Sequence, residues 1–415
     1  MQPTDIVILS NGPGEVTTWV RPVVNTLAQI FGDQPSIRIS VLLSPCPHST
    51  GQEAAIASSY EAVDRVLPAS DFFRFLLWGK TRDNWQWHRH GIVVFLGGDQ
   101  FYTVAVSKRL GYSSLVYAEW DARWYRLIDR FAVMNQRAIE RVPQSYQHKF
   151  SLVGDLMADV ALEVKQSNPS LDTPTVGLLV GSKPAKLTQG VPLCLAIAEK
   201  IQQHLPQTRF IIPVAPTLDL ATLGKYASLQ HNNLIAALGN VTGKLIYPSD
   251  QLPQLITSGG TKIELISQFP AYSDIADCKL CLTTVGANTA ELTALQVPMI
   301  VLLPTQQLDA MRSWDGLPGI LANLPGIGTL FAKSINWLVL KQGRLFAWPN
   351  IWAGAEIVPE LVGKLDPNTV AEMVLDYLRH PEQLQSMSDR LKAVRGETGA
   401  ARQIADIIER EITKT

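Results

Sequence analysis

The stretch from residue 282 to 304, LTTVGANTAELTALQVPMIVLLP, constrains the fold more than any other part of the sequence. It reads as an apolar strand ending at Leu282, a glycine turn, a short helix over 287–295 and a second apolar strand over 299–303. Two strands joined by a helix with almost no linker must run parallel, with a right-handed crossover. The turn leaves free backbone N–H groups at the N-terminus of the helix, and such groups attract phosphate. An ordinary crossover without a ligand explains this stretch equally well.

Short apolar runs alternate with helical patterns along the rest of the chain. Strands are expected at 6–9, 37–43, 62–67, 92–96, 114–117, 131–134, 150–153, 176–180, 209–213, 244–247 and 261–266, and helices at 17–30, 191–203, 367–379 and 381–412. This alternation is typical of α/β folds with doubly wound parallel sheets.

The chain is too long for one core, because single cores stop growing at about 250–300 residues and the sequence has 415. The segment 167–174, SNPSLDTP, has the composition of a linker. We therefore predict a Rossmann-like acceptor-side domain over 1–170 and a second Rossmann-like, nucleotide-binding domain over 171–380, with their strand ends facing a common cleft. A C-terminal helix over 381–415 is expected to cross back to the first domain.

Composition excludes several classes of protein. A hydrophobic content of 46%, with 18% charged residues, indicates a globular chain, and a net charge of −1 argues against binding to nucleic acid. We expect neither a signal peptide nor a membrane span, so the chain is predicted to be cytoplasmic. Cys278 and Cys281 form a CxxC that leads into a buried strand, which favours core packing over zinc or redox chemistry.

The carboxyl ends of the strands are where doubly wound sheets bind ligands. In the first half this rule selects four loops, at 12–15, 97–99, 119–121 and 154–155. No G-x-G-x-x-G follows the first strand or the strand at 176, and no Walker A motif is present. Both absences argue against a dinucleotide-dependent dehydrogenase and a P-loop enzyme.

Several segments together resemble bacterial lipid A disaccharide synthase, a glycosyltransferase built from two Rossmann-like domains (the GT-B type). Residues 179–183, LVGSK, are similar to the family's L-L-P-G-S-R, and 286–292, GANTAEL, to S-G-T-A-T-L-E. Residues 349–361, PNIWAGAEIVPEL, look like L-P-N-L-L-A-G-R-E-L-V-x-E-L-L and are the specific part of the match. Residues 154–159 are similar to G-H-x-x-A-D, and 14–15 fit the opening A-G-E-A-S-G-D. The resemblance covers essentially the whole chain.

The departures from the family pattern lie mainly on the acceptor side. The S-G-D that follows Gly14-Glu15 in the family is replaced by Val-Thr-Thr-Trp, and 96–101 carry one aspartate where the family has two. On the donor side, Lys183 replaces the arginine of G-S-R. The resemblance therefore implies a relative that uses a different acceptor.

The resemblance implies inverting transfer from a nucleotide sugar, UDP-GlcNAc-like, to a lipid or glycolipid acceptor, with no metal or other cofactor. Helix N-terminal amides and Lys183 can stabilise the departing diphosphate, Glu291 and Glu356 suit ribose or sugar hydroxyls, and Asn350 suits the base or phosphate. The expected nucleotide-sugar-binding residues are Gly181, Ser182, Lys183, Gly286, Ala287, Asn288, Thr289, Glu291, Asn350, Gly354 and Glu356.

The catalytic base is predicted to be Asp99, which follows two glycines at a strand end. Glu15 and Asp121 are the reserves. A turn-capping role for Asp99 and a helix-capping role for Glu15 are the alternatives.

Two segments interleave aromatic and basic residues, 72–90 and 336–348. This pattern suits an interfacial helix beside anionic lipid, although a core helix with a solvated face explains each segment as well. With a lipid acceptor, the pattern predicts a peripheral protein at the inner face of the cytoplasmic membrane. His88 and His90 lack a third metal ligand in the sequence nearby.

Two rival functions remain open at this point. A UDP-sugar 2-epimerase shares the two-domain form and binds the donor alone, whereas a sugar-nucleotide-binding or lipid-binding scaffold would have lost catalysis through its altered N-terminal loops. The sequence also leaves open whether the chain forms a homodimer.

Overall fold

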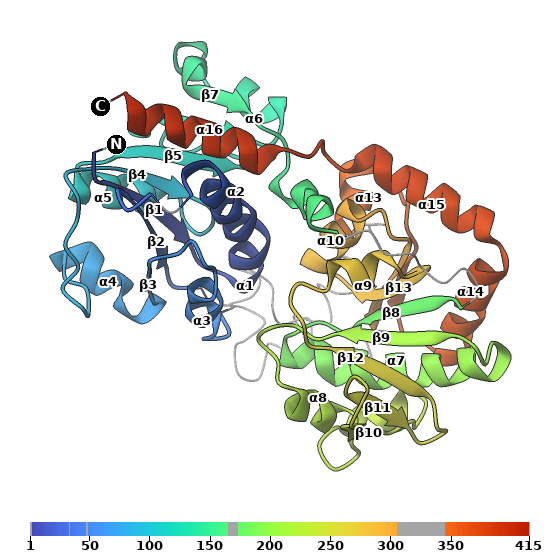
Figure 1. The fold of residues 1–415 in the computed structure, drawn as a ribbon. Helices are drawn as coiled ribbons and strands as arrows, with labels where there is room; N and C mark the ends of the chain where they lie inside the picture. The colour runs from blue at the N-terminus through green and yellow to red at the C-terminus, as the bar shows by residue number, and fades with distance from the viewer. Residues whose placement is uncertain (1, 33, 47–48, 165–172, 305–344, 415) are drawn as a thin grey trace, which may run out of the picture. The chain divides into compact units, whose positions relative to one another are not determined.

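The computed structural model describes the chain except for residues 1, 33, 47–48, 165–172, 305–344 and 415. It divides into two compact units (Figure 1). The first unit comprises Met1–Leu162 and Gly396–Thr415, and the second comprises Glu163–Arg395. Most of the predicted linker, and the aromatic segment 336–348 up to residue 344, lie outside the described residues.

The first unit contains a sheet of seven parallel strands in the order β3-β2-β1-β4-β5-β6-β7. The strands are β1 (Thr4–Ser10), β2 (Ile37–Leu43), β3 (Arg65–Leu67), β4 (His90–Phe95), β5 (Ser113–Ala118), β6 (Arg130–Val133) and β7 (Phe150–Leu152). The helices are α1 (Pro13–Glu15), a π-helical turn (Val16–Val20), α2 (Arg21–Phe31), α3 (Glu53–Ser58), α4 (Ala69–Trp78), α5 (Phe101–Leu110), α6 (Gln136–Glu140), two 3₁₀ segments (Gln144–Lys149 and Leu156–Glu163) and α16 (Ala400–Thr413).

Strand β1 shows why this sheet has two covered faces. All seven of its residues are buried. Ile6 and Ile8 belong to the cluster that contains side chains of α2 and α16, whereas Val7 and Leu9 belong to the cluster that contains side chains of α4 and α5. Successive side chains of a strand point to opposite faces, so a continuous apolar run fills both layers.

The second unit contains eight strands in the order β10-β11-β12-β9-β8-β13-β14-β15. The strands are β8 (Thr175–Leu179), β9 (Arg209–Pro213), β10 (Gly243–Ile246), β11 (Gln254–Thr257), β12 (Lys262–Ile266), β13 (Leu280–Thr284), β14 (Met299–Pro304) and β15 (Glu360–Gly363). The described helices are α7 (Pro184–His204), α8 (Leu220–Tyr226), a 3₁₀ segment (Asn233–Ala237), α9 (Tyr272–Ala276), α10 (Ala287–Ala294), α13 (Trp348–Ala353), α14 (Pro367–Arg379) and α15 (Pro381–Val394).

Pairing in this second sheet is parallel except at one edge, where β10, β11 and β12 run antiparallel. Strands β11 and β15 are not among the strands expected from the sequence. The expected class, two Rossmann-like doubly wound units, is confirmed. Cys278 and Cys281 are buried in an apolar cluster of this unit, as expected for core packing.

The C-terminal segment 381–412 is two helices rather than the single one predicted. The helix breaks after Val394 and resumes at Ala400, and Gly399 between them has a φ of +109°, which favours glycine. Helix α15 packs against α10, α13 and α14 in the second unit. Helix α16 packs on α2 in the first unit, which confirms the predicted return of the C-terminal helix (Figure 1).

The carboxylate of Asp159 fixes the start of α16. It accepts hydrogen bonds from the backbone N–H groups of Gly399 and Ala401, the latter at 2.7 Å. These are groups that a helix N-terminus leaves unpaired, so the interaction caps the helix.

None of the helices in the described parts of the chain combines the length and the apolar character that a bilayer crossing requires.

Candidate functional site

Two glycine turns meet at the carboxyl edge of the second sheet. Strand β8 leads through Gly181 into α7, and the neighbouring parallel strand β13 leads through Gly286 into α10. Both glycines have positive φ, +86° and +143°. The strand order changes direction between β8 and β13, which is where doubly wound sheets bind ligands. The N-termini of α7 and α10 therefore lie at the predicted ligand position.

The side chain of Lys186 lies between these two turns. Its ammonium donates a hydrogen bond to the carbonyl oxygen of Val285 at 2.6 Å. A Cβ added to Gly286 would lie 2.9 Å from the Lys186 Nζ, and one added to Gly181 would lie 3.0 Å from its Cδ. Burial, together with the charge of Lys183, lowers the pKa of Lys186 to about 8. Lys183, the N-cap of α7, was predicted from the sequence as a donor-binding residue, whereas Lys186, one turn further on, was not.

Of the predicted binding residues in α10, one is buried and holds the structure together, and the others are accessible to a ligand. Thr289 is buried; its hydroxyl donates to the carbonyl oxygen of Gly286 at 2.9 Å and accepts from the backbone N–H of Trp348 at 3.2 Å. Ala287 is exposed and Asn288 half-buried at the start of the helix. Burial raises the pKa of the half-buried Glu291 to about 7.

Asn350, at the centre of the most specific motif, is 0% exposed. Its Oδ1 accepts from the backbone N–H groups of Ile357 and Val358, at 2.8 and 2.9 Å. Its Nδ2 donates to the Val358 carbonyl at 2.9 Å and to the Glu360 carboxylate at 2.7 Å. These bonds use both lone pairs and both N–H groups of the amide. Asn350 therefore shapes the loop that follows α13.

That loop begins at Gly354, which ends α13 with a φ of +65°, and it contains Glu356. Gly354 and Glu356 are both exposed, so the Glu356 carboxylate is accessible to a ligand. Asn350 and Glu356 thus have different roles within one motif: the first holds the loop and the second is presented by it.

In the first sheet the order changes direction between β1 and β4, and Glu15 lies there. A Cβ added to Gly97, after β4, would lie 2.9 Å from both Cβ and Cγ of Glu15, and one added to Gly12 would collide with the carboxylate. The two glycines thus leave the space that the Glu15 side chain occupies.

Two further acids belong to this group, Glu119 immediately after β5 and Asp155 after β7. Burial raises the pKa of Glu119 to about 8, and the charges of Asp155 and Glu15 add to the effect. Burial likewise raises the pKa of Asp155 to about 6. The hydroxyl of Tyr117 steadies the Asp155 loop: it donates to the Gly154 carbonyl at 3.4 Å and accepts from the Leu156 N–H at 3.1 Å.

The other two predicted acids follow the same strands, β4 and β5, but their carboxylates are engaged differently. Asp99 is exposed, and its Oδ1 accepts from the backbone N–H of Phe101 at 2.9 Å, which is the capping geometry given above as the alternative. Asp121 is exposed and forms an ion pair with Arg141 at 3.2 Å. Of the three acids predicted from the sequence, Glu15 is the one whose charge raises the pKa of Glu119.

Within the described residues, no group of three or more His, Cys, Asp or Glu side chains has a geometry that could hold a metal ion.

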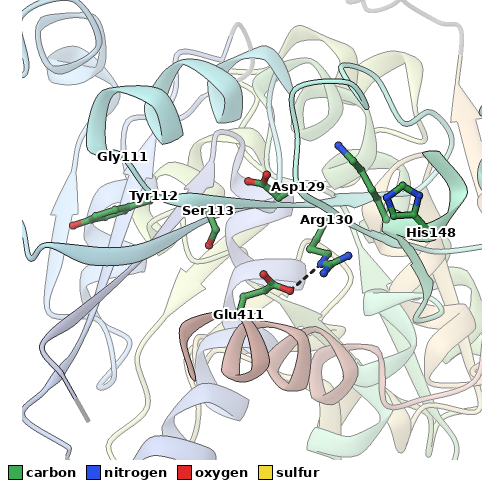
Figure 2. A pocket seen from close by; sticks show the side chains of 8 residues that line it. Gly111, Tyr112, Ser113, Asp129, Arg130, His148 and Glu411 are labelled. Atoms are coloured by element: carbon green, nitrogen blue, oxygen red, sulfur yellow. Dashed lines mark hydrogen bonds and ion pairs between the residues drawn. The ribbon is translucent and has the colours of Figure 1, made fainter. Parts of the chain in front are cut away.

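A hollow of about 480 Å³ lies at the opposite, amino edge of the first sheet (Figure 2). It is lined by Gly111, Tyr112, Ser113, Asp129, Arg130, His148, Lys149 and Glu411. Arg130 pairs with Glu411 at 2.8 Å, and Lys149 donates to two backbone carbonyls. Since these charges are already paired within the protein, the hollow is a weaker candidate than the two carboxyl edges.

No family model matches the chain. Its curated relatives include the lipid-A-disaccharide synthase of Nitrosococcus oceani, 24% identical over 230 residues that cover 55% of this chain and 46% of that protein. The synthase of Anaeromyxobacter sp. (strain K) is 24% identical over 236 residues, covering 56% and 48%. The chain is a distant relative of lipid-A-disaccharide synthase. It spans about half the length of the curated relatives that it matches.

Comparison with solved structures shows that the chain has a GT-B-like fold. A putative UDP-N-acetylglucosamine 2-epimerase from Listeria monocytogenes superposes with a TM-score of 0.54 at 13% identity, covering 100% of this chain and 98% of that one. S. aureus MnaA, solved with UDP, gives 0.56 at 11% identity, with the same coverage. At these identities the likeness concerns the fold alone.

Proposed function

We propose that this protein is a glycosyltransferase that moves a sugar from a nucleotide sugar, UDP-GlcNAc-like, to a lipid acceptor with inversion. The observation that carries the proposal is the pair of glycine turns after β8 and β13, which brings two helix N-termini to one edge of the sheet. Helix N-terminal amides stabilise the negative charge that develops on a departing diphosphate. The distant relationship to lipid-A-disaccharide synthase supports a UDP sugar as donor.

The second unit supplies the donor-binding groups in this proposal. The turn residues Gly181 and Gly286 give the diphosphate access to backbone N–H groups. The accessible carboxylate of Glu356 suits a ribose or sugar hydroxyl, and Glu291 is the reserve. Thr289 and Asn350 contribute by holding the turn and the loop in place.

Transfer in a single displacement also needs a base that removes the proton of the acceptor hydroxyl. We propose Glu119 for this role. A carboxylate with a pKa near 8 is a far stronger base than an ordinary one, yet an appreciable fraction of it is ionised near neutral pH. Glu15 and Asp155 keep it basic through their charges. Asp99 is the base predicted from its position after two glycines at a strand end, and the variants Glu119→Gln and Asp99→Asn separate the two.

A lipid acceptor requires access to a membrane surface, and α4 offers a suitable face. Phe73, Leu77 and Trp78 are 47%, 59% and 66% exposed, while Phe72 and Phe75 on the other side of the helix are buried. Exposed Arg74 and Lys80 flank the aromatic face. Apolar and basic side chains on one helix suit the interface of an anionic bilayer. We propose peripheral contact with the inner face of the cytoplasmic membrane through this helix.

The first experiment is a thermal-shift titration of the full chain with UDP, GDP, ADP and NAD. A ligand that binds only the folded state raises the melting temperature by mass action. We expect stabilisation by UDP and a smaller shift for Glu356→Ala. Stabilisation by NAD, or by none of the four, would contradict the proposal.

Labelled UDP-GlcNAc is then incubated with the enzyme, with and without a lipid extract, and the lipid phase is analysed for label. Labelled glycolipid supports transfer. Turnover of the donor without any acceptor would indicate an epimerase, and UDP binding without turnover would indicate a binding scaffold.

A further inference from the structure

A half-buried cation lies where a helix least favours one. Lys186 is in the first turn of α7, and the N-terminal end of a helix carries partial positive charge that repels cations. The charge of Lys183 acts on it in the same unfavourable sense. Among the described residues the ammonium makes one hydrogen bond, to the Val285 carbonyl, so two of its three N–H donors remain. We therefore expect the Lys186 ammonium to bind an anionic ligand through these two donors.

A second, independent group points to the same place. The hydroxyl of Thr284, the last residue of β13, has no hydrogen-bond partner among the described residues, although Thr284 is only 8% exposed. A Cβ added to Gly181 would lie 3.4 Å from this oxygen, so the hydroxyl faces the same turn as Lys186. Buried hydroxyls in folded proteins are nearly always paired, and an unpaired one indicates a missing partner.

The two glycines keep this space open. Any side chain at Gly286 would meet the ammonium, and any side chain at Gly181 would meet the Lys186 stem at 3.0 Å. Both glycines also have backbone angles that other residues rarely adopt. The turns thus leave room around one ammonium, one hydroxyl and two helix N-termini, a set of donors that matches an oxygen-rich dianion.

We propose that the Lys186 ammonium and the Thr284 hydroxyl bind the diphosphate of the donor, and that Lys186, rather than Lys183, supplies the main charge on the leaving group. This inference rests on the donor site proposed above and names its central residue.

In the transfer step, the acceptor oxygen forms a bond to the anomeric carbon of the sugar as the bond from that carbon to the diphosphate oxygen breaks. The electron pair of the broken bond stays on the diphosphate, and the acceptor proton passes to the base. Lys186 keeps its proton throughout, because the arriving negative charge favours its charged form. Its role is to offset the charge that develops on the leaving oxygen.

The test is isothermal titration calorimetry of the full chain with inorganic pyrophosphate, UDP and uridine. The variants are Lys186→Met, Thr284→Val and, as the matched control, Lys183→Met. We expect Lys186→Met to weaken pyrophosphate and UDP by about tenfold or more, since it removes a desolvated charge partner. Lys183→Met should cost about threefold or less, because no observation places its ammonium between the two glycine turns, and uridine affinity should not change. Equal losses in the two lysine variants, or a larger loss in Lys183→Met, would overturn the inference.

Failure of this inference can be told apart from failure of the proposed function. If UDP binds and Lys186→Met has no effect, the inference falls and the donor site stands. If pyrophosphate binds through Lys186 but UDP binds no more tightly than pyrophosphate, the inference stands and the choice of nucleotide falls.

Folding of the variants is checked by their melting temperatures without ligand. Methionine fills the space of the lysine stem without a buried charge, so Lys186→Met should melt at or above the temperature of the wild type. Lys186→Gln is the second variant should the first fail to fold.

Discussion

The two sheets share the strand pattern around the points where the strand order reverses, but differ in the charged side chains that lie there. Strands β2-β1-β4-β5 of the first sheet correspond in order to β9-β8-β13-β14 of the second. The first edge carries the acids Glu15, Glu119 and Asp155, whereas the second carries Lys186. The same strand order therefore carries acidic groups in one unit and a basic group in the other. The residues that follow the strands determine which kind of chemistry each edge can support.

Burial acts on both edges in the same physical way. It favours the neutral form of each group, so that the pKa of Glu119 rises and the pKa of Lys186 falls. The consequences are opposite, because a carboxylate with a raised pKa accepts protons more readily, while a desolvated ammonium gains more from a bound anion. We infer that the first edge is suited to proton transfer and the second to binding an anion.

The largest expected effect comes from removing the proposed base. Glu119→Gln keeps the shape of the side chain but cannot take a proton, so kcat for transfer should fall by about a hundredfold or more. UDP affinity should stay at the wild-type value, since the change lies in the other unit. Initial rates and calorimetry of the same preparation measure both quantities.

Asp99→Asn is the comparison for this variant. Its side-chain oxygen can still accept from the Phe101 N–H, so the turn is preserved. Loss of activity in Asp99→Asn with activity retained in Glu119→Gln would reassign the base to the residue that the sequence alone indicated.

A second prediction contrasts two residues of one motif in the second unit. Asn350→Ala leaves the partners of four hydrogen bonds unpaired, two of them buried and two partly buried, and should lower the free energy of unfolding by about 2–4 kcal/mol. Glu356→Ala, at an exposed position, should leave the stability nearly unchanged and weaken UDP binding. Urea unfolding followed by fluorescence measures the first effect. Comparable stability losses in both variants would remove the distinction between a positioning residue and a ligand.

The third prediction concerns pH. As a base, Glu119 is active when deprotonated, so kcat/KM should rise with pH through about 8. The negative charge of Asp155 raises the pKa of Glu119, so Asp155→Asn should lower that pKa and move the rise to lower pH, by about half a unit to one unit. The amide retains an oxygen for the Met157 N–H, which preserves the loop.

A pH–rate profile of Asp155→Asn beside the wild type measures this shift. A profile that does not move, or that moves to higher pH, would show that the two carboxyl groups are not coupled in the way described.

The smallest expected effect concerns the exposed face of α4. Replacing Leu77 and Trp78 by serine removes apolar surface from the proposed membrane contact, and should reduce cosedimentation with anionic phospholipid vesicles by about fivefold. Leu229→Ser, at a comparably exposed leucine of the second unit, is the matched control and should have no effect. Equal losses in both would indicate non-specific adhesion.

Much of the fold follows from local sequence. The apolar run 37–43 coincides with β2, and the glycine turns before α7 and α10 lie where the pattern predicts them. An apolar run and a glycine turn can each be recognised from residues that are adjacent in the sequence. Strands β11 and β15 were missed because β11 is short, with polar residues at both ends, and β15 follows a loop whose shape depends on Asn350.

The sites were harder to predict because they depend on pairing between distant segments. The position of Lys186 between the two glycine turns depends on the pairing of β8 with β13, since the carbonyl that it binds is 99 residues away in the sequence. The loops at 12–15, 119–121 and 154–155 were predicted to share one edge of the sheet, but nothing in the sequence distinguishes Glu119 from Asp121 within the second of them. Asn350 was read as a ligand because a polar residue in a motif looks the same whether it binds a ligand or its own loop.

The cap that Asp159 places on α16 has a consequence for how the protein is made. The residues that it joins are 240 and 242 positions apart, and the entire second unit lies between them in the chain. Domains generally fold as they leave the ribosome, but the layer that α16 contributes to the first unit does not yet exist at that stage. During synthesis of the second unit, the apolar surface of α2 that α16 covers would remain open to water and to chaperones.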